Sequence, residues 1–285
     1  FGLKNAPPTF QRVVRRLLGD LLNNGVIPYL DDIIIHAPTQ ETHDKLLAEV
    51  LSRFSAANVR LRREKCHFAQ PEVEYLGHII SNGEVRPAPT KVDALAQFPV
   101  PDNVKSLQRF LGIANFYRRF VSNYSRVAEP LTRLTKKEFA GNFAENWKTE
   151  QQQAFLALKE ALTSEPVVMI YRPDRPVVLF TDASAIGVAA VLMQPDDDDQ
   201  QRVVAYYSRK LADTETRYHA SELECLAVLN AMEHFHVYVH GKHVNIYSDH
   251  AALQWLFSLK NPTSKLFRWS IRLSVYSYTI HHRPG

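Results

Sequence analysis

The stretch Val177-Val178-Leu179-Phe180-Thr181-Asp182 is a run of β-favouring residues that ends at a carboxylate. Such a run is typical of a buried strand. Further elements are predicted after it in the order strand, strand, helix, strand, helix and strand, at residues 187–193, 203–207, 221–238, 244–247, 251–259 and 276–280. Three consecutive strands followed by a helix, a strand and a helix predict an α/β fold.

Upstream of this stretch the sequence predicts helices separated by hairpins. Val26–Leu30 and Ile33–Ile35 flank the pair Asp31-Asp32 in a hairpin pattern, and short strands around residues 74–80 precede Asn82-Gly83, a strong turn signal. Prolines at positions 87, 89, 99 and 101 mark a change to a helical region. The predicted helices lie at about residues 10–22, 42–57, 107–121 and 151–162.

The composition is that of a folded protein with room for two domains. The chain has 285 residues, of which 45% are hydrophobic and 22% charged, and a domain takes roughly 100–200 residues. Two cysteines, Cys66 and Cys225, exclude a disulfide scaffold and are typical of a reducing compartment. No apolar run approaches the roughly 18–20 residues of a membrane helix, so we expect no membrane partner. The chain starts at Phe1 without a leader pattern, and we expect it to be an internal piece of a longer protein.

Positive charge is concentrated in one segment. Residues 86–137 hold 10 basic and 3 acidic residues, although the whole chain carries a net charge of only +4. Aromatic residues alternate with these charges, a pattern that favours a polyanionic partner. A solvated helix face over an aromatic core explains the same pattern equally well.

The adjacent carboxylates Asp31 and Asp32 are the first candidate site. Placing two carboxylates together between apolar strands is costly without a cation, and a pair of divalent ions is a standard solution for phosphoryl transfer. The dipeptide alone is more often a solvated turn, because Asp favours turns.

Asp182, Glu224 and Asp249 are the second candidate site. Two of them end predicted strands and the third lies near the start of a predicted helix, so they can converge on a hard cation that prefers oxygen ligands. Each has an ordinary structural explanation as well. Asp182 can begin a turn with Ser184, Asp249 can cap the next helix, and Glu224 can close a capping box with Ser221.

Other polar clusters compete with these candidates. Glu222 lies two residues before Glu224, about 200° around a helix, so only one of them can face the site, and periodicity does not decide which. The run at 196–199 is read as a solvated turn. The twelve histidines are read as scattered, because no cysteine or acidic partner completes a zinc set at the usual spacings. His281-His282 is read either as a phosphate contact or as part of an edge strand.

Several blocks together give the chain a family resemblance. FGLKNAPPTFQR, YLDDIII, LRREKCHFAQPEVEYLGHIIS, FLGIANFYRRFV and AEPLTRLTK resemble the reverse transcriptases of long-terminal-repeat retrotransposons of the Ty3/gypsy group. TDASAIGVAAVL, AYYSRKL, ELECLAVLNAMEHFHVYVHG and YSDHAAL resemble the attached ribonuclease H domain. The blocks come in the family's order and cover essentially the whole chain, so their combination is specific.

The resemblance implies a fold and a domain division. It implies an α/β (α+β) chain with a partial reverse-transcriptase palm at 1–85, a helical and mixed thumb and connection at 86–172, and a ribonuclease H-like mixed sheet flanked by helices at 173–285. It further implies that the family's first polymerase Asp lies before the chain and its fourth ribonuclease H carboxylate lies beyond it. We therefore expect that this piece does not polymerise alone and is at best a weak, manganese-preferring ribonuclease H.

The resemblance also implies roles for particular residues. Asp31 and Asp32 would hold catalytic Mg²⁺ or Mn²⁺ in the palm, and Asp182, Glu224 and Asp249 would do so in the ribonuclease H domain. The family's catalytic Glu precedes Leu-x-Ala or a close variant, and Glu224, followed by Cys225-Leu226-Ala227, fits that pattern, whereas Glu222 occupies the family's variable upstream acidic position. The nucleotide pocket would include Phe1 and Gly2, and the residues implied to contact nucleic acid are Leu76, Gly77, His78, Arg109, Arg118 and Arg119.

The implied function is that of an RNA-directed DNA polymerase with ribonuclease H activity. Its partners would be an RNA–DNA hybrid, a primer–template, dNTPs and other products of the pol and gag genes. The implied location is the cytoplasm, in a virus-like particle, with the nucleus as the alternative. Two other classes stay open: a non-catalytic nucleic-acid-binding remnant of a decayed element, and an interaction module retained by a host.

Overall fold

The computed structural model describes residues 4–139, 142–164, 166–250 and 264–283. The chain forms two compact units, Phe1–Ser81 and Asn82–Gly285. The predicted division at 85–86 lies just beyond the boundary between these units. The further division at 172–173 stays a prediction.

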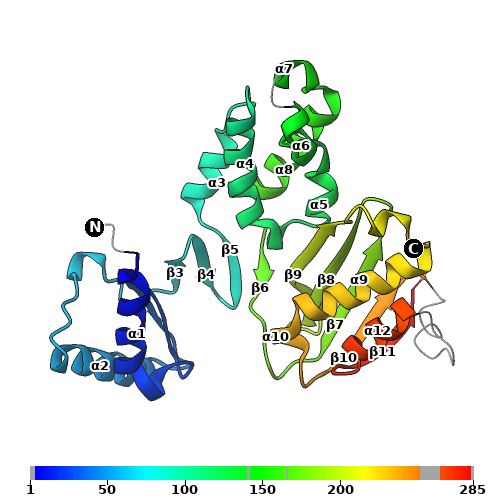
Figure 1. Ribbon diagram of the computed structural model, residues 1–285. Helices are drawn as coiled ribbons and strands as arrows, with labels where there is room; N and C mark the ends of the chain where they lie inside the picture. Colours follow the sequence, from blue (N-terminus) through cyan, green and yellow to red (C-terminus); the bar gives the residue numbers. More distant parts are fainter. Residues whose placement is uncertain (1–3, 140–141, 165, 251–263, 284–285) are drawn as a thin grey trace. The chain divides into compact units, whose positions relative to one another are not determined.

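The first unit combines two helices with two hairpins (Figure 1). Its elements are α1 (Ala6–Leu18), β1 (Val26–Tyr29), β2 (Asp32–Ile35), α2 (Gln40–Ala56), β3 (Glu72–Tyr75) and β4 (His78–Ser81), with short 3₁₀ turns at Gly19–Leu21 and Arg63–Lys65. The core is small and consists of side chains of α1, the 3₁₀ turn after it, α2 and the first hairpin: Val14, Leu18, Leu21, Val26, Val50 and Phe54.

Helix α1 begins earlier and ends earlier than the sequence predicted. Pro7 and Pro8 lie in its first turn, where a missing N–H costs nothing. The helix ends at Gly19, whose φ of 51° is in the left-handed region, rather than at Asn23. Glycine takes this conformation without the steric cost that other residues incur.

The second unit opens with a helical region. Its elements are β5 (Glu84–Pro87), α3 (Pro89–Ala96), α4 (Val104–Phe116), α5 (Tyr124–Val127), α6 (Glu129–Leu134), α7 (Phe143–Asn146), α8 (Thr149–Thr163) and β6 (Val168–Met169), with 3₁₀ turns at Arg118–Phe120 and Lys137–Phe139. The predicted helix at 107–121 therefore ends at Phe116. Phe110, Tyr117, Phe155 and Leu158 lie at the centre of an aromatic and aliphatic core.

A five-stranded mixed sheet forms the rest of the second unit (Figure 1). Its strands are β7 (Val177–Ala183), β8 (Gly187–Pro195), β9 (Gln201–Lys210), β10 (His243–Ser248) and β11 (Ser277–His282), in the order β11-β10-β7-β8-β9. β7, β8 and β9 are antiparallel, whereas β10 runs parallel to β7 and β11 runs parallel to β10. This architecture confirms the predicted α/β fold with a mixed sheet.

Helix α9 (Ala220–His234) packs against the sheet and contributes a large share of the buried core beside it. The predicted helix at 221–238 is in fact two helices, because the backbone at Phe235 leaves helical geometry and the ring is buried at 1% exposure. Short α10 (His236–Val239) follows, and α12 (Ser264–Leu273) packs on α9. The helix predicted at 251–259 lies outside the described residues. In the described part of the chain no helix is both long and apolar enough to cross a membrane.

Candidate active sites

The Asp31-Asp32 pair lies at the tip of the first hairpin. Tyr29 pairs with Asp32 across the strands, and Leu30 in the turn has a φ of 54°. Gln11 of α1 holds this turn: its Oε1 accepts from the Leu30 backbone N–H at 2.5 Å, and its Nε2 donates to the Pro28 carbonyl at 3.2 Å. Both aspartates are exposed, so the fold presents their carboxylates to solvent.

Tyr75 lies near the same hairpin. Its hydroxyl donates to the Ile27 carbonyl at 3.2 Å. Partial burial, and then the negative charge of Asp32, raises the pKa of Tyr75. The aromatic hydroxyl and the Asp32 carboxylate therefore share one local electrostatic environment within the first unit.

The predicted nucleic-acid contact at Leu76-Gly77-His78 is the turn of the second hairpin. Leu76 and Gly77 have φ values of 50° and 76°, and Tyr75 pairs with His78. Two consecutive residues with positive φ are typical of a two-residue hairpin turn. The His78 ring nitrogen Nδ1 lies 3.0 Å from the Leu76 carbonyl oxygen. Phe1 and Gly2, predicted to line a nucleotide pocket, lie outside the described residues.

The sheet brings Asp182 and Asp249 to the same end of two adjacent strands. β10 runs parallel to β7 with Tyr247 opposite Phe180. Asp182 and Asp249 each come two residues after that pair, so both carboxylates lie at the same edge of the sheet. Asp182 is still within β7, whereas Asp249 directly follows β10. Both side chains are exposed.

Glu224 is the buried member of this group. It is 6% exposed on α9, and the Ser248 hydroxyl donates to its Oε2 at 3.4 Å. Burial raises the pKa of Glu224 to about 7, with further contributions from the negative charges of Asp249 and Asp182. Partial burial, and then Asp249, likewise raises the pKa of Asp182. The three carboxylates therefore repel one another electrostatically.

Glu222 has a different environment from Glu224. Its Oε2 accepts from the His219 backbone N–H at 3.2 Å, which closes a capping box at the start of α9. Its Oε1 forms an ion pair with Lys265 at 3.1 Å. The capping explanation considered for Glu224 with Ser221 thus applies to Glu222 with His219. The helix that Asp249 was expected to cap lies outside the described residues.

The three carboxylates suit a hard divalent cation in chemistry and charge. They supply oxygen atoms, which such ions prefer, and a bound cation would offset the repulsion that raises the pKa values of Glu224 and Asp182. Within the described ranges, however, no three His, Cys, Asp or Glu side chains are close enough together to form a complete metal-binding group.

The remaining predicted contact residues differ in their surroundings. Arg109 is exposed on α4. Arg118 donates to the Ser208 carbonyl and Arg119 donates to the Val204 carbonyl at 3.4 Å, both on β9. Arg118 and Arg119 therefore have a packing role that the sequence did not indicate, and their contact with phosphate stays a prediction.

The polar clusters read as structural have structural partners. Asp196 accepts from the backbone N–H groups of Asp198 and Gln200 at 3.0 and 2.9 Å, which orders the turn at 196–199. Asp197 pairs with Arg172 and Arg175. His281 and His282 lie in the edge strand β11, in contact with Asn245 and the Asp249 carbonyl.

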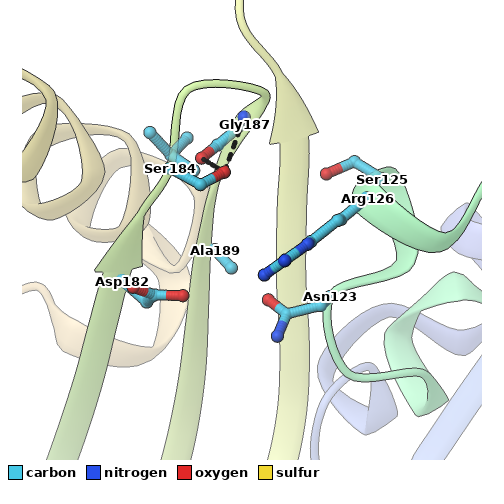
Figure 2. A pocket seen from close by; sticks show the side chains of 8 residues that line it. Asn123, Ser125, Arg126, Asp182, Ser184, Gly187 and Ala189 are labelled. Carbon is cyan, nitrogen blue, oxygen red and sulfur yellow. Dashed lines mark hydrogen bonds between the residues drawn. The ribbon is translucent and has the colours of Figure 1, made fainter. Parts of the chain in front are cut away.

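Arg126 is a residue that the sequence did not single out. A small pocket that is open to solvent is lined by Asn123, Ser125, Arg126, Asp182, Ser184 and Gly187 among others. In Figure 2 the side chains of Arg126 and Asn123 extend toward the sheet, and the Asp182 carboxylate points into the same space. The positive charge of Arg126 lowers the pKa of Asp182, against the larger effect of burial. The signal available in the sequence was the basic segment 86–137, which does not tell one arginine from another.

Comparison with known protein families assigns two parts of the chain. Residues 1–80 match the family model of the reverse transcriptase (RNA-dependent DNA polymerase), and residues 172–276 match that of the RNase H-like domain found in reverse transcriptase. The chain combines a reverse-transcriptase region with a ribonuclease H-like region, as retrotransposon Pol polyproteins do.

Relatives in two organisms match over the full length of the chain. The Drosophila melanogaster retrovirus-related Pol polyprotein from transposon 297 is 38% identical over 285 residues, which is 100% of the chain and 26% of the relative. The Schizosaccharomyces pombe transposon Tf2-3 polyprotein is 33% identical over 289 residues, which is 100% of the chain and 21% of the relative. The chain thus spans about a quarter of these polyproteins.

Solved structures with the same fold come from foamy virus. The protease-reverse transcriptase in complex with double-stranded DNA aligns with a TM-score of 0.83 at 22% identity, over 100% of this chain and 50% of that one. The protease-reverse transcriptase in complex with an RNA/DNA hybrid aligns with a TM-score of 0.77 at 22% identity, over 99% of this chain and 38% of that one. These similarities confirm the mixed α and β architecture.

Proposed function

We propose that the chain is part of a Ty3/gypsy-type Pol protein that copies RNA into DNA and cleaves the RNA strand of the resulting hybrid. The observation that carries the proposal is the electrostatic coupling of three carboxylates, two at the same end of the adjacent strands β7 and β10 and one on helix α9: Asp182, Asp249 and Glu224. The match of residues 1–80 to reverse transcriptases supports the polymerase half. The similarity to transposon polyproteins supports the source.

In the ribonuclease reaction, the three carboxylates would hold Mg²⁺ or Mn²⁺. When bound, such an ion activates a water molecule and stabilises the charge on the leaving oxygen. Asp182 and Asp249 would contribute exposed carboxylate oxygens from adjacent strands. Glu224 would contribute an oxygen from the buried side, oriented by the Ser248 hydroxyl. Burial makes ionisation of the Glu224 carboxyl unfavourable. A cation bound beside the carboxylate would offset this cost.

In the polymerase reaction, Asp31 and Asp32 would hold the metal ions near the primer end. The hairpin holds them in place through Gln11, and the turn at Leu76-Gly77-His78 would contact the primer strand. The proposed domain division is a palm at 1–85, a thumb and connection at 86–172 and a ribonuclease H domain at 173–285. Residues from the rest of the polyprotein would complete the nucleotide pocket.

The proposed partners are an RNA–DNA hybrid, a primer–template and dNTPs, together with other pol and gag products. Double-stranded DNA and an RNA/DNA hybrid are bound by the foamy virus proteins of the same fold, which supports the nucleic-acid partners. We propose the cytoplasm, within a virus-like particle, as the site of action, with the nucleus as the alternative compartment.

A cleavage assay tests the ribonuclease proposal. The 285-residue chain is incubated with an RNA strand labelled at its 5′ end and paired with DNA, in Mg²⁺ or Mn²⁺. We expect cleavage of the hybrid, loss of cleavage with EDTA, and a fall of at least about 100-fold in Asp182→Asn. Asp198→Asn, the same charge change in the exposed turn at 196–199, should retain the wild-type rate. Equal cleavage of hybrid and single-stranded RNA, or an unaffected Asp182→Asn, would exclude the proposal.

The alternative of a non-catalytic binding remnant predicts a different result. Such a protein would bind the hybrid in a salt-dependent way without cleaving it in either metal. An interaction module would do neither. The presence of all five predicted metal-binding carboxylates, Asp31, Asp32, Asp182, Glu224 and Asp249, favours the catalytic proposal over both.

A further inference from the structure

The helical segment before the sheet packs tightly on strands β8 and β9. The Ser125 backbone N–H donates to the Ser208 hydroxyl at 2.9 Å, and Lys210 forms an ion pair with Glu129 at 2.7 Å. Gly187 permits this approach, because a Cβ atom there would lie 2.6 Å from the Arg209 carbonyl oxygen and 3.2 Å from the Ser125 hydroxyl. The segment around Ser125 is therefore held in a fixed place on the sheet.

This packing directs two polar side chains toward Asp182. Arg126 is exposed, and Asn123 has a φ of 51°, a left-handed conformation that Asn adopts more readily than most residues. Both side chains extend from one segment into the pocket beside Asp182 (Figure 2). The pocket is thus built from two parts of the sequence, one helical and one from the sheet.

Arg126 has unused hydrogen-bonding capacity. In the described part of the chain, its side chain has no hydrogen bond and no ion pair within 4 Å, and its interaction with Asp182 is electrostatic at longer range. By contrast, Arg118 and Arg119 in the same region donate to backbone carbonyls. Guanidinium groups bind phosphate oxygens with two parallel hydrogen bonds.

A polyanion that approaches three carboxylates is repelled unless a cation lies nearby. We propose that Arg126 and Asn123 form a phosphate subsite beside Asp182, which binds one backbone phosphate of the RNA–DNA hybrid next to the position that is cleaved. This inference rests on the proposed function and adds to it a substrate-positioning site outside the ribonuclease H carboxylates. Arg126 supplies the charge, and the Asn123 amide donates a further hydrogen bond.

A phosphate-by-phosphate binding experiment tests the subsite. Hybrids that carry one uncharged methylphosphonate at each successive position of either strand are titrated with the 285-residue chain in EDTA. For the wild type, we expect one position at which the substitution weakens binding about 5–20-fold. Arg126→Gln should bind the unmodified hybrid more weakly by a similar factor. In this variant, the methylphosphonate at that position should cause no further loss of binding. The strand in which that position falls identifies which phosphate is bound.

Matched variants separate phosphate binding from a structural role. Arg126→Lys should keep the slope of log K against log salt, whereas Arg126→Gln should flatten it by about 0.7–0.9, one phosphate's contribution. Asn123→Gly keeps the positive φ without strain and should weaken binding at the same phosphate only. Lys148→Gln, the same charge change at an exposed lysine that does not line the pocket, should match the wild type.

Each outcome bears on the subsite separately from catalysis. Coupling between Arg126 and one phosphate without any cleavage in Mg²⁺ or Mn²⁺ supports the subsite and excludes the ribonuclease proposal. If the wild type cleaves the hybrid and Arg126→Gln responds to the methylphosphonate at every position as the wild type does, the subsite is overturned and the ribonuclease proposal stands. Failure of the wild type to bind the hybrid overturns both.

Discussion

Glu222 and Glu224 are two residues apart on α9 and have opposite surroundings. Glu222 accepts from the His219 N–H at 3.2 Å and pairs with Lys265 at 3.1 Å. Glu224 is buried at 6% exposure and accepts a hydrogen bond from the Ser248 hydroxyl. The negative charges of Asp249 and Asp182 repel its carboxylate. One glutamate thus caps and anchors the helix, while the other completes a group of carboxylates.

This difference predicts opposite effects of two otherwise identical substitutions. Glu224→Gln should lower hybrid cleavage by at least about 100-fold, because it removes a negative oxygen from the proposed metal site. Glu222→Gln should keep the rate within about threefold and destabilise the fold by at most about 1 kcal/mol, because glutamine still accepts from the His219 N–H and only the ion pair with Lys265 is lost. Rates on a labelled hybrid and thermal unfolding of both variants provide the measurement. Lost activity in Glu222→Gln with full activity in Glu224→Gln would reverse the assignment.

The sequence could not choose between these glutamates for a physical reason. Helix α9 is buried over most of its circumference, with every residue from Leu223 to Leu229 buried, so it has no polar face whose period would orient Glu224. The choice depended on the family resemblance alone. In the structure the choice follows from contacts with Ser248 and Lys265, which are distant in sequence.

Local patterns were predicted well, and long-range contacts were not. The hairpin around Asp31-Asp32 and the strand that leads to Asp182 depend on neighbouring residues and were found in the sequence. The roles of Arg118 and Arg126 depend on strand β9 and on Asp182, which lie 56 to 90 residues farther along the chain. No periodicity in residues 86–137 distinguishes an arginine that bonds to a carbonyl from one that lines a pocket.

The hydrogen bonds by which Gln11 holds the Asp31-Asp32 turn can be tested by amide hydrogen exchange. The Leu30 N–H donates to Gln11 Oε1 at 2.5 Å. Gln11→Ala removes this acceptor, so exchange of the Leu30 amide should accelerate at least about tenfold, equal to about 1.4 kcal/mol of lost protection. Gln11→Glu keeps an acceptor oxygen and loses only the donor to Pro28, so the Leu30 amide should stay protected. Exchange is followed by NMR. Equal exchange rates of the Leu30 amide in the wild type, Gln11→Ala and Gln11→Glu would show that Gln11 does not hold the turn.

The close packing at Gly187 predicts that even one methyl group is harmful. In Gly187→Ala the new Cβ would lie 2.6 Å from a backbone carbonyl oxygen, which cannot move without shifting β9. We expect a loss of about 1–3 kcal/mol in the free energy of unfolding. Gly112→Ala is the control, because nothing lies within 4 Å of that position in α4. It should stabilise the chain by about 0.5–1 kcal/mol. Urea titration measures both changes, and equal effects would refute the steric argument.

The ion pair between Arg209 and Glu215 predicts a stability that depends on pH. Arg209 donates two hydrogen bonds to the Glu215 carboxylate, at 2.6 and 2.9 Å, and the Ala212 N–H adds a third at 2.7 Å. The side chains are 30% and 16% exposed. Hydrogen bonding by Arg209 is the main cause that lowers the pKa of Glu215 below its ordinary value of 4.5.

The direction of the effect follows from which state binds the proton. Well above pH 4.5 the carboxyl is ionised in both states, so the stabilisation by the pair is fully present. As the pH falls below 4.5, the unfolded chain takes up a proton before the folded chain does, and the stabilisation is lost as the pH approaches the lowered folded pKa. Glu215→Gln should therefore destabilise the second unit by about 1–3 kcal/mol at pH 7, and the difference from wild type should shrink below pH 4.5.

A surface ion pair provides the comparison that makes this prediction specific. Glu150 pairs with Arg133 at 2.8 Å, but the two side chains are 58% and 41% exposed. Glu150→Gln should therefore change stability by less than about 1 kcal/mol at any pH, as exposed pairs do. Urea unfolding of the three proteins at pH 7 and at pH 3.5 tests the pair. Two results would show that the charge of Glu215 does not stabilise the fold through Arg209. One is a loss in the free energy of unfolding at pH 7 as small for Glu215→Gln as for Glu150→Gln. The other is a loss for Glu215→Gln that is larger at pH 3.5 than at pH 7.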